Sequence, residues 1–143
     1  MKRITIDRHY IYLRDGGVCR FCGKGLRYGK MSLDHYFPHS AGGPDEVFNL
    51  VCSCKTCNVQ KRSLVPEDWQ AFWIQAFEQA VRDRKLFLSV QGITYAELQE
   101  MVPGIIRATR EGDMTIFDNN TKRFHVKQCK IKKITDININ DAM

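Results

Sequence analysis

Two cysteine pairs constrain the fold of this chain more than any other feature. Cys19 and Cys22 form one pair with two residues between them, Cys54 and Cys57 form a second, and residues 23–53 separate the two. Pairs with this spacing can place four thiolates around one tetrahedral zinc ion. Gly23 follows the first pair directly and suits the positive φ that such a turn often requires. The spacing therefore predicts a structural zinc site that joins the two ends of this interval.

Two other uses of the cysteines fit the sequence less well. Redox chemistry of the thioredoxin kind needs one pair beside a strand–helix unit, so a second pair is surplus. A disulfide scaffold is disfavoured because the first residues lack the apolar stretch of a secretory signal. Cys52 and Cys129 have no partner at ligand spacing, and we expect them to be small buried hydrophobes. Zinc held by four thiolates has no open coordination position, so any reaction needs another site.

The charge of the chain is concentrated in one region. The 143 residues carry a formal net charge of +6. Residues 1–63 hold 11 Lys and Arg against five acidic residues, whereas residues 64–143 hold 11 of each. The whole excess therefore lies in residues 1–63 and favours an anionic partner such as nucleic acid. No apolar run approaches the roughly 18 residues of a membrane helix, so we expect a cytoplasmic protein without a membrane partner. No coiled-coil repeat indicates an oligomer.

The sequence of the first region, residues 1–64, predicts short helices and strands around the cysteine pairs. We expect a helix over residues 4–15, ended by Gly16-Gly17, and strands over residues 31–35 and 47–51. A helix should follow the second pair, over residues 55–63.

The second region, residues 65–143, has clearer periodicity. Pro66 suits a first helical turn, and the apolar residues from Trp69 to Val81 recur at helical spacing, which predicts a core-facing helix up to Arg84. The sequence Thr94-Tyr95-Ala96-Glu97 matches a capping box, so a helix should begin at Tyr95 and end before Pro103. The remaining expectations are a hairpin formed by residues 115–117 and 123–126, and a frayed tail after Ile134.

Four polar residues lie inside and just after the cysteine interval. Asp34 and His35 are adjacent, Asn49 follows, and Asn58 comes directly after the second pair. The stretch CRFCGK…SLDHYFPHSAGG…FNLVCSCKTCNVQK resembles the zinc-bearing HNH endonucleases, which share a ββα-metal fold with the nuclease colicins and many homing and restriction enzymes. The resemblance covers about residues 8–62.

The resemblance implies a role for each of these residues. His35 would be the general base that activates the attacking water, and Asp34 would be a ligand of the catalytic divalent metal. Asn49 would tie the loop between the strands and hold His35 in position. Asn58 stands where the family usually has a histidine ligand of the same metal, so this chain has the His-Asn-Asn variant. Lys61 and Arg62 would face the phosphate backbone.

Elementary chemistry supports these roles. Histidine can act as a base near neutral pH, and the oxygens of Asp34 and Asn58 are the ligand type that Mg²⁺ and Mn²⁺ prefer. Adjacent residues of a strand point to opposite faces, so a strand end or bulge must bring Asp34 and His35 to one site. His39 is a candidate phosphate contact, with a solvated loop histidine as the alternative.

A basic run in the second region is a further candidate contact. Residues 122–133 hold six cations and no acidic residue, and we expect Lys130, Lys132 and Lys133 to contact nucleic acid, with a solvated strand face as an equal alternative.

Together the patterns predict an α+β protein with a zinc-stabilised ββα-metal nuclease core in residues 1–64. Residues 65–143 should form a helical and hairpin extension that packs on the core. The expected activity is divalent-metal-dependent DNA cleavage, with Mg²⁺ or Mn²⁺ as cofactor and one strand nicked per encounter. A non-catalytic zinc-stabilised DNA-binding module and a zinc-framed protein-interaction domain are the alternatives.

Overall fold

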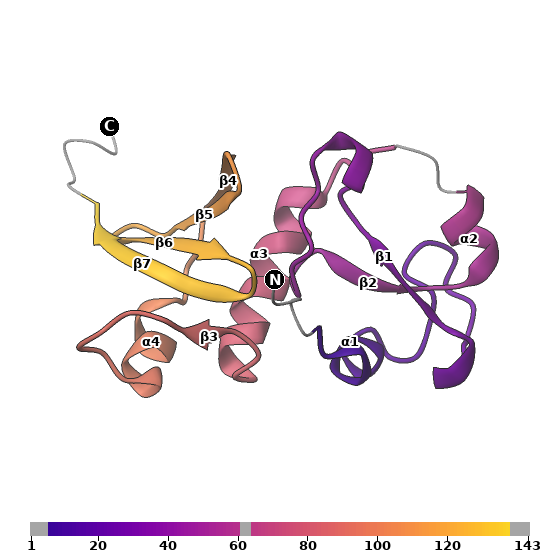
Figure 1. Ribbon diagram of the computed structural model, residues 1–143, viewed down its shortest axis with the longest axis horizontal. Coiled ribbons are helices and arrows are strands. Elements are labelled where there is room, and N and C mark those ends of the chain that lie inside the picture. Colours follow the sequence, from indigo (N-terminus) through magenta and orange to yellow (C-terminus); the bar gives the residue numbers. More distant parts are fainter. Residues whose placement is uncertain (1–5, 61–63, 138–143) are drawn as a thin grey trace, which may run out of the picture. The chain divides into compact units, whose positions relative to one another are not determined.

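The chain divides into two compact units. The computed structural model describes residues 6–60 and 64–137, and the division falls between Trp69 and Gln70 (Figure 1). We call residues 1–69 the N-terminal unit and residues 70–143 the C-terminal unit. Both contain helices and strands, which confirms the α+β class. The packing of residues 65–143 on the first region stays a prediction.

The N-terminal unit places two short strands and a helix in ββα order. Strand β1 (Ser32–His35) pairs antiparallel with β2 (Leu50–Ser53), and α2 (Lys55–Gln60) follows β2 directly. Helix α1 (Arg8–Arg14) contacts β2, and α2 contacts β1. The cysteine interval therefore encloses both strands.

Helix α1 is fixed by polar contacts at its two ends. Asp7 caps it by accepting a hydrogen bond from the Tyr10 N–H at 2.9 Å. At the other end, the side chains of Arg14 and Asp15 are each only 4 % exposed and form an ion pair. Arg14 donates to the carbonyl oxygens of Val47 and Leu50, both at 2.7 Å. This pair therefore ties α1 to the start of β2. Of the helix expected over residues 4–15, residues 1–5 lie outside the described part.

The second strand of this unit differs from the prediction. Residues 47–49 form a turn, in which the N–H groups of Asn49 and Leu50 both donate to the Glu46 carbonyl, and β2 begins at Leu50. Val47 and Phe48 are buried through this turn. The apolar run therefore correctly predicted that these residues are buried. It wrongly predicted a strand, because a turn can also bury adjacent side chains.

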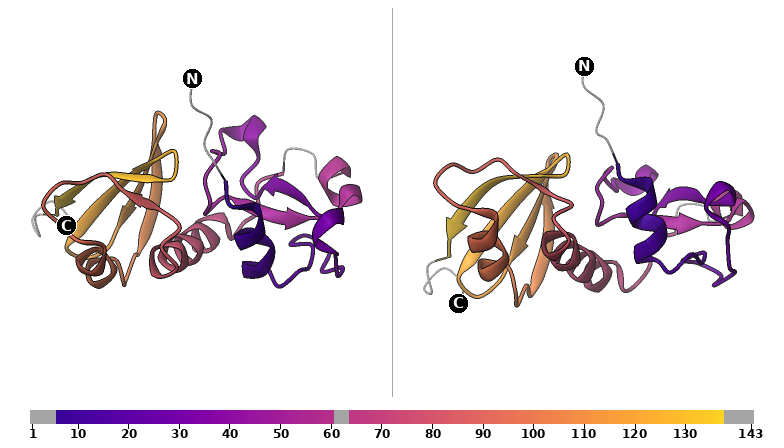
Figure 2. Two further views of the ribbon diagram at one scale, coloured as in Figure 1. Left: turned by 60° about the horizontal axis from the view of Figure 1, so that its bottom comes forward. Right: turned by 90° about the horizontal axis from the view of Figure 1, so that it is seen from below.

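The C-terminal unit contains a five-stranded sheet with the order β3-β7-β6-β5-β4, with helices α3 and α4 on one side of it (Figure 2). Four strands form an antiparallel meander, and β3 lies parallel to β7 at the edge. The elements are α3 (Trp69–Arg82), β3 (Phe87–Leu88), α4 (Tyr95–Met101), β4 (Arg107–Glu111), β5 (Met114–Asp118), β6 (Lys122–Lys127) and β7 (Lys130–Asp136).

The core of the C-terminal unit lies between α3 and the sheet. The predicted apolar face of α3 is buried from Phe72 to Val81, and Phe77 stacks on Phe117 of β5 with ring centroids 4.0 Å apart. Phe124 of β6 lies 6.1 Å from Phe77 by the same measure. Helix α3 begins at Trp69 rather than at Pro66.

Two sequence-based predictions in this unit are confirmed, and one is wrong. The capping box of α4 is present, with Glu97 N–H donating to the Thr94 hydroxyl and the Thr94 N–H donating to the Glu97 carboxylate. Strands β5 and β6 form the expected hairpin. The fraying expected after Ile134 is wrong for residues 135 and 136, because β7 continues to Asp136 and pairs with β6. Residues 138–143 lie outside the described part.

Candidate nuclease and metal site

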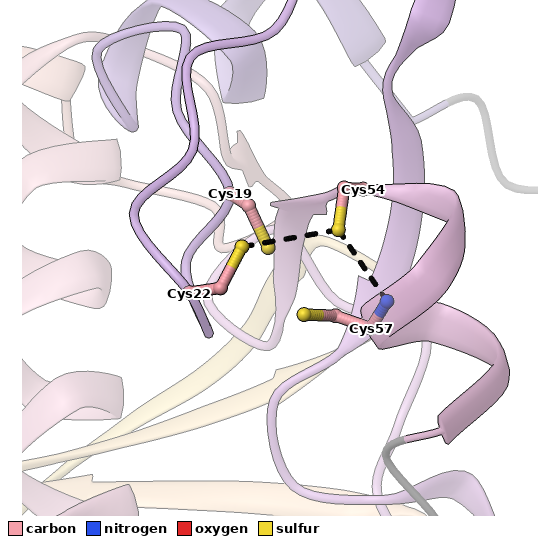
Figure 3. Close-up of side chains that lie close together, drawn as sticks. All are labelled: Cys19, Cys22, Cys54 and Cys57. Carbon is pink, nitrogen blue, oxygen red and sulfur yellow. Dashed lines mark hydrogen bonds between the residues drawn. The ribbon is translucent and has the colours of Figure 1, made fainter.

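The four cysteines of the two pairs converge on one point (Figure 3). Cys19 and Cys22 come from the loop after α1, and Cys54 and Cys57 from the junction of β2 and α2. Their Sγ atoms all lie within 4.8 Å of one another, and those of Cys22 and Cys54 are 3.9 Å apart. Four thiolates bonded to one zinc ion at about 2.3 Å would be about 3.8 Å apart. The cluster therefore fits a structural metal such as zinc.

The loop of the first pair is a tight turn of the expected kind. The Gly23 N–H donates to the Cys19 carbonyl at 2.8 Å, and Gly23 has φ +77°. The Cys19 N–H donates to the Lys24 carbonyl at 2.8 Å, which closes the turn. A residue with a Cβ would be strained at position 23, so glycine is required there for conformational reasons.

The thiols of the cluster differ in acidity. Burial opposes ionisation of Cys19, but hydrogen bonds from the backbone at Cys54, Cys22 and Phe21 outweigh it and lower the pKa of this thiol to about 6. A hydrogen bond with Cys54, together with burial and the other thiols, raises the pKa of Cys57 to about 12. A bound cation would have to displace the proton of Cys57. Cys52 and Cys129 lie outside the cluster and are buried, as expected.

Asp34 and His35 occupy the end of β1. His35 is the last residue of the strand, and its backbone N–H donates to Oδ1 of Asp34 at 2.8 Å. The His35 side chain is 24 % exposed. The other carboxylate oxygen of Asp34, Oδ2, is buried. The strand end thus presents an accessible imidazole next to a shielded carboxylate.

Asn49 holds the loop between β1 and β2. Its side chain is fully buried, and its Oδ1 accepts from the Phe37 N–H at 2.8 Å. Its Nδ2 donates to the carbonyl oxygens of Phe37 at 3.1 Å and Pro44 at 2.9 Å. The Asn49 carbonyl also accepts from the Tyr36 N–H, next to His35. One side chain therefore crosslinks both ends of the loop that follows His35.

The same loop brings a residue to His35 that the sequence analysis missed. Asp45 Oδ1 lies 2.5 Å from Nε2 of His35. The loop folds back at Gly43, whose N–H donates to the Pro38 carbonyl at 2.8 Å and where a Cβ would lie only 1.8 Å from the Phe37 oxygen. Asp45 follows Gly42-Gly43-Pro44, a sequence that indicates a loop but gives no sign of the histidine it returns to. The exposed His39 also lies here, with its ring centroid 5.4 Å from that of His35.

The remaining predicted site residues of this unit are Asn58, Lys61 and Arg62. Asn58 is exposed on α2, the helix that contacts β1. Among the described residues, no group of three or more His, Cys, Asp and Glu side chains besides the four cysteines is close enough to hold a metal. The metal-ligand roles of Asp34 and Asn58 therefore stay predictions. Lys61 and Arg62 lie outside the described residues.

The basic run of the C-terminal unit divides into paired and unpaired cations. Lys122, Arg123 and Lys127 form ion pairs with Asp136, Asp118 and Asp113, respectively. Lys130, Lys132 and Lys133 on β7 are exposed and make no ion pair within residues 6–60 and 64–137. The three lysines singled out from the sequence are therefore the uncompensated ones.

Comparison with known proteins connects this site to a family. A family model described as HNH endonuclease matches residues 19–71, a segment that begins at the first cysteine pair and includes β1, β2 and α2. No curated protein matches the chain. No helix in the described part of the chain has the length and apolar character needed to cross a membrane. HNH domains act on nucleic acids, which agrees with the positive charge of the first 63 residues. The matched segment and the residues that converge in it support a relation of residues 19–71 to the HNH endonuclease family.

Proposed function

We propose that this protein is a divalent-metal-dependent DNA endonuclease that hydrolyses phosphodiester bonds and nicks one strand per encounter. The observation that carries the proposal is the accessible imidazole of His35 at the end of β1, beside Asp34 and next to the loop crosslinked by Asn49. A histidine in a fixed position with a carboxylate beside it is the minimum that metal-assisted hydrolysis of a phosphodiester requires.

Each residue has a distinct part in this proposal. His35 takes the proton of the attacking water, and Asn49 keeps His35 in place through the loop. Asp34 and Asn58 offer one carboxylate and one amide oxygen, a donor set suited to a hard cation that keeps several waters. A bound Mg²⁺ or Mn²⁺ would neutralise charge on the phosphate and stabilise the leaving oxygen. The cysteine cluster, holding zinc, would keep both strands and α2 in register.

The central test is cleavage of supercoiled plasmid with and without Mg²⁺ or Mn²⁺. His35→Ala should lower the cleavage rate by about 10²–10⁴-fold, the usual contribution of a general base, while DNA affinity is retained. His9→Ala is the matched control, because His9 is an exposed histidine of the same unit. Open-circle product should appear before linear product if one strand is cut per encounter. A wild-type protein that binds DNA but cleaves under no metal condition would favour the non-catalytic DNA-binding module.

Metal preference tests the role of Asn58. An amide oxygen is a weaker and harder ligand than imidazole, so we expect Mn²⁺ to equal or exceed Mg²⁺ as cofactor. Asn58→His should extend activity towards Ni²⁺ and Co²⁺, and Asn58→Gln is a control that keeps the amide. Wild-type activity that is highest with Ni²⁺ or Zn²⁺ would contradict a ligand role for Asn58.

The three unpaired lysines of β7 support a second phosphate contact, from the C-terminal unit. Replacing Lys130, Lys132 and Lys133 with Gln should weaken DNA binding and lower the slope of log K against log salt by about 0.9 per lost contact. The matched control is the pair Lys122→Gln and Lys127→Gln, because these cations are already compensated by Asp136 and Asp113. An equal change of slope per lysine replaced in the two variants would indicate general charge rather than a specific contact.

A further inference from the structure

A loop of the N-terminal unit carries positive charge to which the proposed function assigns no role. It consists of residues 24–30, between the first cysteine pair and β1, and we call it the basic loop. It holds the cations Lys24, Arg27 and Lys30, and residues 23–31 include no acidic residue. All three cations are exposed, and none of their side chains forms an ion pair or hydrogen bond within residues 6–60 and 64–137. The basic loop therefore presents uncompensated charge to solvent.

Hydrogen bonds fix the first half of the basic loop to its surroundings. The Lys24 carbonyl accepts from the Cys19 N–H at 2.8 Å, so the turn of the cysteine cluster positions the start of the loop. The Leu26 N–H donates to the Gly17 carbonyl at 2.8 Å. The Leu26 carbonyl in turn accepts from the Tyr12 hydroxyl of α1. The backbone that carries the cations therefore has a defined path.

Tyr28 anchors the second half of the basic loop to α1. Its ring meets the Tyr12 ring edge-on, with ring centroids 5.4 Å apart. The guanidinium carbon of Arg8 lies 5.6 Å from the centroid of the Tyr28 ring, a cation–π contact. Tyr28 stands between Arg27 and Lys30 in the sequence. Its anchoring therefore fixes the backbone on which both of these cations are carried.

The chemistry of the basic loop fits a phosphate backbone better than an acidic protein surface. Protein interfaces are built round a desolvated core of aromatic and apolar anchors. Within residues 24–30, the exposed large hydrophobic side chain is that of Tyr28, and its ring already packs on α1. Exposed cations without acidic partners can instead release condensed counterions from DNA. Because the loop is already ordered, binding costs less conformational entropy.

We propose that the basic loop binds the phosphate backbone of DNA next to the strand that carries His35. This inference rests on the proposed nuclease function and deepens it, because it names a surface that holds the substrate. Strand β1 begins at Ser32, two residues after the loop, and its span to His35 is about 10 Å. One strand of duplex DNA has a phosphate for about every 3.4 Å of helix axis. One DNA backbone can therefore reach both the loop and His35, about three nucleotides apart.

The first experiment measures DNA affinity of the full chain without added Mg²⁺ or Mn²⁺, so that cleavage does not intervene. Replacing Lys24, Arg27 and Lys30 with Gln should weaken binding of a short duplex by about 10–100-fold at low salt. The slope of log K against log salt should fall by about 0.9 per lost contact. The control is the pair Lys122→Gln and Lys127→Gln, whose cations are compensated by carboxylates. Zinc content equal to that of the wild type shows that the variant is folded.

Two further measurements test the position and the order of the loop. In the wild type, DNA should protect the amines of Lys24 and Lys30 from acetylation, read by mass spectrometry, and should leave Lys122 and Lys127 unchanged. Tyr28→Ala keeps all three charges and removes the anchor, so it should weaken DNA binding by about 2–10-fold, the cost of one aromatic pair. Tyr28→Phe keeps the ring and should bind like the wild type.

The outcomes separate the inference from the function on which it rests. An unchanged salt slope in the triple variant, or equal acetylation of Lys24 and Lys30 with and without DNA, would overturn the binding surface. An equal loss of slope per cation in the control pair would also overturn it, because charge at any position would then serve. A wild type whose two lysines are protected but that cleaves DNA under no metal condition would contradict the proposed nuclease and support the binding surface.

Discussion

The N-terminal unit positions its candidate site with two four-residue strands and a six-residue helix, whereas the C-terminal unit stacks a 14-residue helix on a five-stranded sheet. In the N-terminal unit the long-range contacts named above are polar: the hydrogen bonds of Arg14 to the carbonyl oxygens near β2, those of the buried Asn49, and the cluster of four thiols. In the C-terminal unit they are aromatic and apolar, centred on Phe77.

This difference indicates two sources of stability in one chain. Short elements bury little apolar surface, so a unit of about 70 residues built from them needs an additional staple. The cysteine cluster can supply it, because the binding energy of a structural metal is largely folding energy. The C-terminal unit has a continuous apolar layer between α3 and the sheet and needs no such staple. The following predictions test this contrast, beginning with the largest expected effect.

Loss of the metal should unfold one unit and spare the other. Cys22→Ser removes one of four ligands, and apparent binding energies of structural zinc reach about 10–16 kcal/mol, so the N-terminal unit should lose its fold. Hydrogen exchange of the full chain should show β1, β2 and α2 unprotected and β5 and β6 still protected. Purified wild type should contain about one zinc per chain. Cys129→Ser is the control, since Cys129 lies outside the cluster. If the amides of β1 and β2 stayed protected in zinc-free protein, the N-terminal unit would not depend on the metal for its fold.

A cavity in the apolar layer should destabilise the C-terminal unit and leave the N-terminal unit folded. Phe77→Ala removes a ring that stacks on Phe117, and such a truncation costs about 3–5 kcal/mol. Segment-resolved denaturation should show the loss in the C-terminal unit, with zinc content unchanged. Phe87→Ala is a matched control, because Phe87 in β3 is 66 % exposed. Zinc loss in Phe77→Ala would show that the two units do not fold separately.

Asp118 is a buried carboxylate of the C-terminal unit and should make the stability of this unit depend on pH in the acid range. Burial opposes ionisation of Asp118, but hydrogen bonds from Arg123 and Arg107 outweigh it and lower the pKa of this carboxyl below its ordinary value. Because the folded-state pKa is the lower one, the stabilisation is complete above the unfolded-state value of about 3.9 and is lost as pH falls through the folded-state pKa.

Asp118→Asn should therefore cost about 1–2 kcal/mol at neutral pH, since both arginines are partly exposed and keep some hydration. The difference in unfolding free energy between Asp118→Asn and wild type should decrease as pH falls below 4. Urea unfolding at pH 7 and pH 3 measures it. A pH-independent difference between Asp118→Asn and wild type would show that the carboxylate charge has no part in the stability.

The smallest expected effect concerns the turn between β6 and β7. Gln128 and Cys129 both have positive φ, at 53° and 59°, in a two-residue hairpin turn that favours Asn-Gly. Gln128→Asn should stabilise the C-terminal unit by up to about 1 kcal/mol, because Asn adopts this conformation at lower cost. The midpoint of thermal unfolding of the C-terminal unit should rise. Gln128→Ala, which lacks that preference, should not raise it.

Much of this protein could be predicted from local patterns. The cysteine spacing placed four thiols together, the capping box fixed the start of α4, and the periodicity of α3 identified its buried face. These features depend on residues close in sequence or on one strong chemical constraint. The strand expected over residues 47–51 failed because apolarity reports burial and does not distinguish a turn from a strand.

The amino-acid sequence by itself therefore determined the α+β class, the four-cysteine cluster and the similarity of residues 19–71 to the HNH endonucleases. Tertiary structure alone decided which polar groups meet. Asp45 reaches His35 only because Asn49 and Gly43 fold the loop back, and three of the six cations in residues 122–133 find carboxylates only once β6 and β7 are in place. Such contacts depend on the path of a loop and on strand register, which are set by the sum of many weak interactions along the chain and leave no local pattern.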